Sequence, residues 1–455
     1  MKLLKAKHVH CIGIGGIGIS ALARWLRSEG ISVSGSDAAD SDNIRQLRDE
    51  KIEVRIGESH LPEASEVVLY SPAIAVTHPE RQEAARKNIP VLSYPEALAQ
   101  MSEGLQVIAV SGTHGKTSTT TFLGMLLEAA QLDPIVVVGS RVKNWGGNFR
   151  AGKGKYLVLE ADEFNRSFLN YHPEISVVTN IEHDHVDTYA HFEDVLDTFT
   201  QFLGQTKGTY FLNADDPGIQ QLPQHIRDRA HWFSLNNAKQ DLQISHDING
   251  STLVSSEFGT IHVPLPGEHM ISNALGAIAV AQHLGVKKEA IELGFSRLQG
   301  IERRFQHLGT YFGTEFISDY AHHPTEIAAT LQAAKQIFPD KKLIVVFQPH
   351  QQQRLNAFGS AFTEALVPAD TILLYHTYEV LGREQNKANV FTLEDLYAQL
   401  QEKKKNVELC DTEEVLDKSL HTHISSNAVV LCLGAGSVHA LMQKILAKEQ
   451  HDNAR

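Results

Sequence analysis

A glycine-rich loop that carries a lysine has the most specific chemistry in this sequence. Residues 111–118, SGTHGKTS, lie between an apolar run and a helical pattern, which is the strand–loop–helix context of a phosphate-binding loop. Backbone amides and Lys116 would bind the β- and γ-phosphates of ATP, and the Thr117 hydroxyl would reach Mg²⁺. Val110 stands where the usual motif has its first glycine, so Gly112 must supply that flexibility. The predicted nucleotide-binding residues of the loop are Gly112, Thr113, His114, Gly115, Lys116, Thr117 and Ser118.

Carboxylate and histidine side chains follow two further predicted strands. Glu160 comes directly after the apolar run KYLVL, where a carboxylate is well placed to hold Mg²⁺; a solvated acidic turn is the alternative. In residues 179–187, TNIEHDHVD, we expect His185 to lie near the Mg²⁺ and His183 to pack or hydrogen-bond locally. Zinc would also suit this histidine spacing, but no cysteine is near and the other donors are oxygens. The predicted metal ligands are Thr117, Glu160 and His185.

A second glycine-rich motif lies near the start of the chain. Residues 13–18, GIGGIG, match G-x-G-x-x-G between a predicted strand and a predicted helix, so the backbone and the helix N-terminus can approach a diphosphate closely. Asp37 lies beyond the second strand, where it could hydrogen-bond a ribose or a base. Glycines used only for helix–strand packing are the alternative. The predicted substrate-binding residues of this motif are Gly15, Gly16, Ile17, Gly18 and Asp37.

Histidines also follow predicted strands in the last third of the chain. The runs DYAHHPT and QPH each end a strand, and open α/β sheets place their ligands at such strand ends. Loop histidines without a role are the alternative. The candidates are Asp319, His323 and His350, with Arg354 beyond them. Arg303 and Arg304, just before this block, could reach ATP phosphates from a neighbouring domain.

Short apolar runs alternate with helical patterns, which predicts an α/β protein with parallel sheets. A chain of 455 residues is too long for one core and suggests roughly three domains. We predict a Rossmann-like domain over 1–104, a central ATPase-type parallel-sheet domain over 105–300 and a Rossmann-like domain over 301–455. Closure around a ligand would use hinges near Gly104 and Gly300. The predicted strands span 8–14, 31–35, 67–70, 105–110, 135–138, 156–159, 175–179, 209–212, 316–318, 343–347, 371–374, 407–409 and 429–433.

Composition narrows the class of partner. The formal net charge is -13, which argues against non-specific nucleic-acid or anionic-membrane binding. Three separated cysteines, Cys11, Cys410 and Cys432, lie in or beside apolar runs and read as buried thiols in a reducing compartment. No apolar run is long enough to span a bilayer, and the first residues lack a signal-peptide pattern. We therefore expect a cytoplasmic protein. A monomer and a homodimer both stay open.

The order of these motifs resembles the Mur ligase family over essentially the whole chain. Seven motifs in matching order are far more specific than any one of them. They are GIGGIGIS, SGTHGKTS, LEADE, TNIEHDHVDTY, PGEHMISNALGA, DYAHHPTEI and FQPH. The resemblance implies a first domain that binds a UDP substrate, a central ATPase domain and a third domain that docks the incoming amino acid.

The resemblance also implies roles for single residues. His269 and Asn273 would border ATP, with Asn273 near the adenine, while Arg304 and Asp319 would close on ATP, with Asp319 toward the ribose. Ser71, in the YSPAI strand end, would bind the UDP substrate. The acceptor amine and carboxylate would lie among His323, His350 and Arg354. The catalytic candidates are Lys116, His185, His323, His350 and Arg354.

Within the family, YSPAI, SFLNYHP and DYAHHP look like the branch that adds L-alanine to UDP-N-acetylmuramate. That branch uses ATP and Mg²⁺ to form an acyl phosphate in peptidoglycan precursor synthesis. Other members carry a carbamylated lysine, and no lysine lies between Lys155 and Lys207. The sequence departs from the branch in reading QPHQQQRL for QPHRYSRT and GAGS for GAGD. Both departures lie in the third domain, so a tripeptide acceptor, as in the recycling branch, stays open.

Two other classes of protein stay open from the residues alone. A dehydrogenase dependent on NAD(P) would use the first glycine-rich loop and Asp37 but would leave the Lys116 loop idle. A non-catalytic nucleotide-binding regulator would keep the fold without turnover. The chain has a complete set of candidate phosphate-binding and metal-binding residues, Lys116, Thr117, Glu160 and His185. This argues against a non-catalytic regulator.

Overall fold

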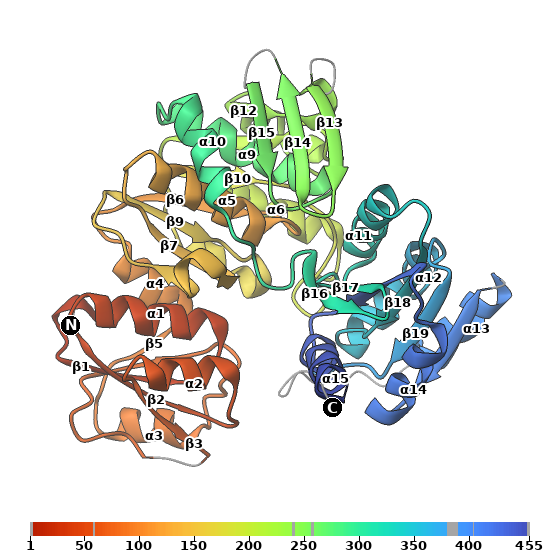
Figure 1. Ribbon diagram of the computed structural model, residues 1–455. Helices are drawn as coiled ribbons and strands as arrows, with labels where there is room; N and C mark the ends of the chain where they lie inside the picture. Colours follow the sequence, from red (N-terminus) through yellow and green to blue (C-terminus); the bar gives the residue numbers. More distant parts are fainter. Residues whose placement is uncertain are drawn as a thin grey trace. The chain divides into compact units, whose positions relative to one another are not determined.

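The computed structural model describes residues 3–57, 60–238, 242–255, 259–379, 390–403 and 405–452 (Figure 1). Contacts divide the chain into two compact units. The first unit consists of Met1–Glu182, Phe192–Ser234 and Asn273–Gln299. The second unit consists of His183–His191, Leu235–Ser272 and Gly300–Arg455. Parallel sheets flanked by helices occur in both units, so the predicted α/β class is confirmed.

The first unit opens with a five-stranded parallel sheet in the order β3-β2-β1-β4-β5. Its strands are β1 (His8–Ile12), β2 (Ser32–Asp37), β3 (Glu53–Ile56), β4 (Val67–Tyr70) and β5 (Val91–Ser93). Its helices are η1 (Leu3–Lys5), α1 (Ile17–Ser28), α2 (Asp42–Asp49), α3 (Pro79–Arg86) and α4 (Tyr94–Met101). The strand order changes direction between β1 and β4, and the carboxyl ends of strands at such a point are where open α/β sheets usually bind ligands.

A seven-stranded sheet completes the first unit, in the order β12-β11-β10-β6-β9-β7-β8. Its strands are β6 (Gln106–Ser111), β7 (Ile135–Val142), β8 (Gly147–Arg150), β9 (Tyr156–Glu160), β10 (Ile175–Val178), β11 (Thr209–Asn213) and β12 (Ala230–Phe233). Only β8, at the edge, runs antiparallel among the pairings described. The associated helices are α5 (Lys116–Ala129), η2 (Lys143–Trp145), η3 (Phe164–Asn170), α6 (Phe192–Gly204), η4 (Ile219–Gln221), α7 (Gln224–Arg227) and α10 (Lys288–Arg297). Helix α9 (Glu268–His283) begins in the second unit and belongs to the first unit from Asn273 on.

Helix α5, which follows the phosphate loop, is buried on all sides. Every residue from Thr117 to Leu127 is buried, which is typical of a helix enclosed on all sides. Phe122 packs edge-on against Phe295 of α10, with ring centroids 5.4 Å apart. The phosphate-loop residues at the start of α5 are thereby fixed to a rigid element.

The second unit contains a three-stranded antiparallel sheet, β13 (Leu242–Asp247), β14 (Gly250–Ser255) and β15 (Gly259–Val263), whose strands lie side by side in Figure 1. The short helix α8 (Leu235–Ala238) precedes it. Alternation of exposed and buried residues along β13 and β15 indicates a sheet with one face toward solvent.

A six-stranded sheet forms the rest of the second unit, in the order β16-β17-β21-β18-β19-β20. Its strands are β16 (Gln306–Tyr311), β17 (Thr314–Asp319), β18 (Lys342–Phe347), β19 (Thr371–Tyr375), β20 (Asn406–Cys410) and β21 (Ala428–Leu433). Its helices are α11 (Pro324–Ile337), α12 (Gln352–Leu366), α13 (Leu393–Glu402), α14 (Glu413–His423) and α15 (Val438–Asp452). Strands β18 and β21 are almost wholly buried between two hydrophobic clusters, as parallel strands covered on both faces require.

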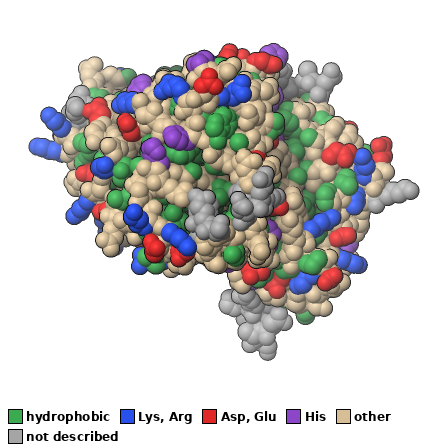
Figure 2. All heavy atoms as spheres, turned by 90° about the horizontal axis from the view of Figure 1, so that it is seen from above, with side chains coloured by type: hydrophobic (Ala, Val, Ile, Leu, Met, Phe, Trp, Pro, Cys, Tyr) green, Lys and Arg blue, Asp and Glu red, His purple; other side chains and the backbone are tan. Residues whose placement is uncertain are grey.

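Cys11, Cys410 and Cys432 are free and buried, as the part of the prediction that concerns their burial requires. Burial raises the pKa of both Cys11 and Cys432 to about 12. Among the described residues, no helix is long and apolar enough to cross a membrane. On the face shown in Figure 2, basic and acidic side chains are mixed together.

Candidate functional site

The phosphate loop lies between β6 and α5, and its shape depends on two glycines. Gly112 has φ +128° and Gly115 has φ +83°, conformations that a residue with a Cβ rarely adopts. A Cβ on Gly112 would lie 2.1 Å from the Thr179 hydroxyl oxygen. Gly112 therefore has the freedom that the variant motif requires, although Val110 occupies the usual glycine position.

Lys116 begins α5 and is surrounded by acceptors. Its Nζ donates to the Gly112 and Thr113 carbonyl oxygens at 2.7 and 3.2 Å and to Glu163 Oε2 at 2.8 Å. Burial opposes the charge on the amine, but Glu163 and Asp162 outweigh burial and raise the pKa of Lys116. Burial raises the pKa of Glu163 to about 8, against the opposing effect of Lys116. The lysine is charged and held inside its own loop.

Thr117 and Glu160 form the pair of oxygen donors expected for a metal. The Thr117 hydroxyl lies 3.0 and 3.1 Å from the two Glu160 carboxylate oxygens. The Gly139 amide donates to Glu160 Oε2 at 2.6 Å, and a Cβ on Gly139 would lie 2.7 Å from the same oxygen. The two oxygen donors of Thr117 and Glu160, the second fixed by the Gly139 amide, fit Mg²⁺ better than zinc.

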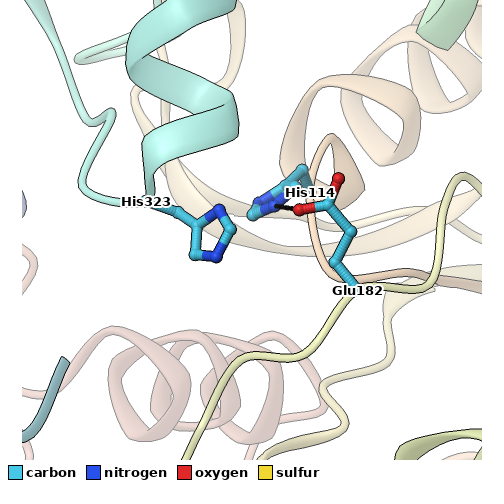
Figure 3. Close-up of side chains that lie close together, drawn as sticks. All are labelled: His114, Glu182 and His323. Carbon is cyan, nitrogen blue, oxygen red and sulfur yellow. Dashed lines mark hydrogen bonds and ion pairs between the residues drawn. The ribbon is translucent and has the colours of Figure 1, made fainter. Parts of the chain in front are cut away.

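Residues 179–182, which directly follow β10, form hydrogen bonds with the phosphate loop. The sequence did not predict these contacts. Asn180 Oδ1 accepts from the His114 amide at 2.8 Å, and Asn180 Nδ2 donates to the His114 carbonyl at 3.0 Å. The Thr113 hydroxyl oxygen accepts from the Glu182 amide at 2.8 Å. His114 Nε2 lies 3.2 Å from Glu182 Oε2 (Figure 3). The polar TNIE run after a parallel strand could have indicated these contacts. The carboxyl ends of neighbouring parallel strands lie at the same edge of the sheet, where the phosphate loop also begins.

Asn273, on α9, lies directly against the loop. A Cβ on Gly115 would be 2.3 Å from Asn273 Oδ1, and Asn273 is buried. Ser118 is also buried, inside α5. Within the first unit, the phosphate loop, Glu160 and Asn273 therefore lie close together.

The predicted residues of the first glycine-rich motif converge at the carboxyl ends of β1, β2 and β4. The Gly15 amide donates to Asp37 Oδ2 at 2.8 Å, so this carboxylate already supports the turn. Asn43 Nδ2 donates to the Gly15 carbonyl at 2.8 Å. Gly16 caps α1, whose first residue, Ile17, is 40% exposed.

Close packing explains the small residues of this motif. A Cβ on Gly18 would lie 2.9 Å from the Tyr94 ring, and a Cβ on Gly13 would lie 3.2 Å from the Ser71 Cβ. Ser71 therefore borders the same turn from the end of β4. The arrangement provides backbone donors and a helix N-terminus for an anionic group.

In the second unit, Asp319 ends β17 and braces the turn before β16. Its carboxylate accepts from the Phe305 amide at 2.7 Å and from the Ala321 amide at 2.9 Å. Burial raises the pKa of Asp319. The guanidinium carbons of Arg303 and Arg304 lie 4.7 and 5.2 Å from the Tyr320 ring centroid. The contribution of Tyr320 was not predicted.

His269, at the start of α9, is partly buried and uncharged at neutral pH. Burial, with a smaller effect of Arg304, lowers the pKa of His269 to about 4. Its ring also fills the space beside Gly267, where a Cβ would lie 2.7 Å from His269 Cε1. The neutral ring is available for hydrogen bonding without adding a positive charge.

Arg354, in the first turn of α12, forms a buried ion pair with Asp184. The Nε–Oδ1 and Nη2–Oδ2 distances are 3.0 and 3.1 Å, and the two residues are 4% and 6% exposed. Burial alone would raise the pKa of Asp184, but Arg354 outweighs it and lowers that pKa. The sequence did not predict this partner, which lies 170 residues away.

The predicted histidines of the second unit occupy strand ends and helix starts. His323 caps α11, and its ring lies 4.8 Å from the Phe358 ring. His350 stacks on Tyr378 with centroids 5.6 Å apart. His185 has φ +49°, and its carbonyl accepts from the Thr188 and Tyr189 amides. His183 hydrogen-bonds the Tyr189 carbonyl at 3.1 Å.

Three family profiles match this chain in order along its length. Residues 8–105 match the Mur ligase family catalytic domain, residues 110–281 the Mur ligase middle domain, and residues 303–436 the Mur ligase glutamate ligase domain. The matched segments contain the phosphate loop, the first glycine-rich motif and the strand-end histidines.

Curated relatives and solved structures are similar over nearly the whole chain. UDP-N-acetylmuramate–L-alanine ligase from Aquifex aeolicus is 37% identical and covers 97% of this chain and 98% of its own. The enzyme of the same name from Nitratidesulfovibrio vulgaris is 35% identical, with 98% and 99% covered. UDP-N-acetylmuramate-alanine ligase MurC from Thermotoga maritima superposes with a TM-score of 0.81 at 25% identity, covering 98% and 99%. A murein peptide ligase from Psychrobacter arcticus shares the fold, with a TM-score of 0.70 at 22% identity and 98% and 99% covered.

Proposed function

The chain belongs to the Mur ligase family, and we propose that it joins L-alanine to the lactyl carboxylate of UDP-N-acetylmuramate. Its class of reaction is therefore ATP-dependent ligation. The observation that carries the proposal is that Lys116 and Thr117 of the phosphate loop contact the carboxylates of Glu163 and Glu160. The names of the relatives support UDP-N-acetylmuramate as the substrate and L-alanine as the acceptor. On this proposal the reaction belongs to peptidoglycan precursor synthesis in the cytoplasm.

The reaction has two steps. A lactyl carboxylate oxygen attacks the γ-phosphorus of ATP, the bond to the β–γ bridging oxygen breaks, and an acyl phosphate and ADP result. The amine of L-alanine then attacks the acyl carbon, phosphate leaves, and the amine gives up a proton. A free carboxylate is a poor acyl donor, which is why activation is needed. The protein's contribution is to position the reactants and to neutralise charge as the phosphoryl group moves.

Lys116 would stabilise the transferring phosphoryl group. In the structure its Nζ bonds two loop carbonyls and Glu163, and phosphate oxygens would take over part of this coordination. Thr117 and Glu160 would hold Mg²⁺, with His185 as a third ligand. Mg²⁺ would offset the negative charge of the phosphates.

We propose ligand-binding roles for the remaining predicted residues. Gly15–Gly18, Asp37 and Ser71 would bind the UDP substrate, because donors and a helix start converge there. His269 and Asn273 would border the nucleotide, and Arg304 and Asp319 would contact ATP. His323, His350 and Arg354 would surround the acceptor.

The proposal is tested by phosphate release with ATP, Mg²⁺ and UDP-N-acetylmuramate. L-Alanine or the L-Ala–γ-D-Glu–diaminopimelate tripeptide is supplied as the acceptor. We expect release that depends on L-alanine. Release only with the tripeptide would contradict the acceptor and leave the family assignment and ATP chemistry intact. Nucleotide binding without release for either acceptor would contradict the proposed reaction.

A further inference from the structure

Gln351 has a strained backbone at the start of α12. Its φ is +69°, in a region that a residue with a side chain rarely adopts. Its amide donates to the Tyr378 carbonyl at 2.8 Å, and its carbonyl accepts from the Leu355 amide at 3.2 Å. The surrounding structure thus fixes the strained conformation, and such strain often occurs where a side chain must be aimed at a ligand.

The Gln351 side chain leaves its donor unused. Oε1 accepts from Arg354 Nη1 at 3.4 Å, which fixes the orientation of the amide. Nε2 is buried and has no hydrogen-bond partner within the described part of the chain. The residue is 7% exposed, so water reaches the amide poorly. A buried amide donor without a partner is unfavourable, and an acceptor atom on a ligand would correct this.

Arg354 cannot readily perform the same task. Its Nε and Nη2 bind Asp184 in a two-point ion pair. Its Nη1 contacts the His350 carbonyl at 3.2 Å and Gln351 Oε1 at 3.4 Å. The carboxylate of a ligand could form a two-point contact with the Arg354 guanidinium only if it displaced Asp184 from this buried ion pair. Arg354 therefore acts on Gln351, and Gln351 presents the available N–H group.

We propose that Gln351 is a specificity residue whose Nε2 donates a hydrogen bond to the carboxylate of the incoming amino acid. This inference rests on the proposed function. Arg354, fixed by Asp184, is a positioning residue that holds the amide. The local charges suit a small zwitterion, because Arg354 and Asp184 balance one another and burial lowers the pKa of His322, which favours its neutral form. A phosphate oxygen is the other anionic acceptor that such an amide could meet.

The experiment compares Gln351→Leu and Gln351→Gly with the wild type in steady-state phosphate release. Both changes remove the donor, while glycine also relieves the positive φ. We expect the KM for L-alanine to rise about 10- to 100-fold, the worth of a buried hydrogen bond to a charged group. The kcat and the KM values for ATP and UDP-N-acetylmuramate should stay close to wild type. Gln351→Gly should melt no lower than the wild type, which a merely structural role would not allow.

Gln352→Leu is the matched control. The neighbouring Gln352 amide donates to Asn356 and to the Phe391 carbonyl, so its loss should lower the melting temperature and leave the KM for L-alanine unchanged. An unchanged KM for L-alanine in folded Gln351 variants would overturn the inference. A rise in the KM for ATP instead would assign the amide to phosphate and also overturn it. A wild type that ignores L-alanine would refute the proposed function first, and this inference with it.

Discussion

Lys116 is held by groups that ATP would partly replace. It donates to two loop carbonyls and to the buried Glu163, so the position of its ammonium group is fixed before a nucleotide binds. When ATP binds, its phosphates meet the Lys116 ammonium group, which is already fixed in position. Such preorganisation lowers the cost of stabilising the transferring phosphoryl group.

Lys116→Ala should fold and lose phosphate release by roughly 100- to 1,000-fold, because the fixed positive charge at the γ-phosphate is removed. Release is measured with saturating UDP-N-acetylmuramate and L-alanine, and folding is checked by circular dichroism. Lys207→Ala, at an exposed lysine of the same unit, should retain wild-type rates. A folded Lys116→Ala protein at full rate would refute the assignment of the loop.

At the scale of elements, α9 and the phosphate loop are packed too closely for any side chain at position 115. The steric cost of a side chain at position 115 can be separated from the cost of its backbone conformation by comparison with Gly146. Gly146 also has a positive φ, +63°, but a Cβ there would meet nothing within 4 Å. The two glycines share the conformation and differ in the contact with Asn273.

Gly146→Ala should cost about 1–2 kcal/mol, the penalty of a left-handed conformation for an L-residue. Gly115→Ala should cost a further 1–3 kcal/mol or so, because its Cβ overlaps Asn273, and should weaken ATP binding. Urea unfolding and nucleotide titration measure the two effects. Equal losses of stability in the two variants would argue against the packing of α9 on the loop.

The lowered pKa of His269 makes the stability of the folded protein depend on pH. Its pKa in the folded protein is about 4, below its ordinary value, so between about pH 4 and 6.5 the unfolded chain binds a proton that the folded chain excludes. Stability from this group is complete above pH 6.5 and is lost as the pH falls. Lowering the pH from 7 to 5 should cost about 2 kcal/mol through this residue.

His269→Gln should remove that part of the pH dependence. Urea unfolding of the wild type and the variant at pH 7 and pH 5 isolates it, since the other titrating groups are common to both proteins. Parallel changes in the two proteins would mean that His269 becomes protonated in the folded state without cost.

At the scale of the whole molecule, the chain passes between the two units after Glu182, His191, Ser234, Ser272 and Gln299. Gly300, at the last of these boundaries, has φ +127°. Glycine permits backbone rotations that other residues resist, so this position is the natural place for a hinge.

Binding of ATP and UDP-N-acetylmuramate should therefore change the small-angle X-ray scattering profile, because ligands of several domains draw those domains together. Lys116→Ala, exposed to the same ligands, should show a smaller change. Identical profiles with and without ligands in the wild type would indicate a rigid enzyme.

Much of the fold followed from the pattern of the sequence. Apolar runs such as Leu343–Phe347 lie within buried parallel strands, because both faces of those strands are covered. Strand β3 was not predicted, since its EVRI segment is short and mostly exposed. The phosphate loop was found because its residues are contiguous.

Long-range partners could not be found in the same way. The Asp184–Arg354 pair joins residues 170 positions apart, and no local spacing encodes it. The orientation of Gln351 depends on Arg354 of that pair and on the Tyr378 carbonyl. Such groupings follow from the topology of the sheet, which a single sequence specifies only indirectly.

The buried pair of Asp184 and Arg354 also restricts how this protein can evolve. Replacing either residue alone leaves an uncompensated charge in the interior, a loss of about 3–5 kcal/mol, whereas replacing both can be nearly neutral. The two positions therefore cannot drift independently. Among descendants of this sequence they should be inherited or exchanged together, and a lineage that keeps one without the other should carry a compensating change beside it.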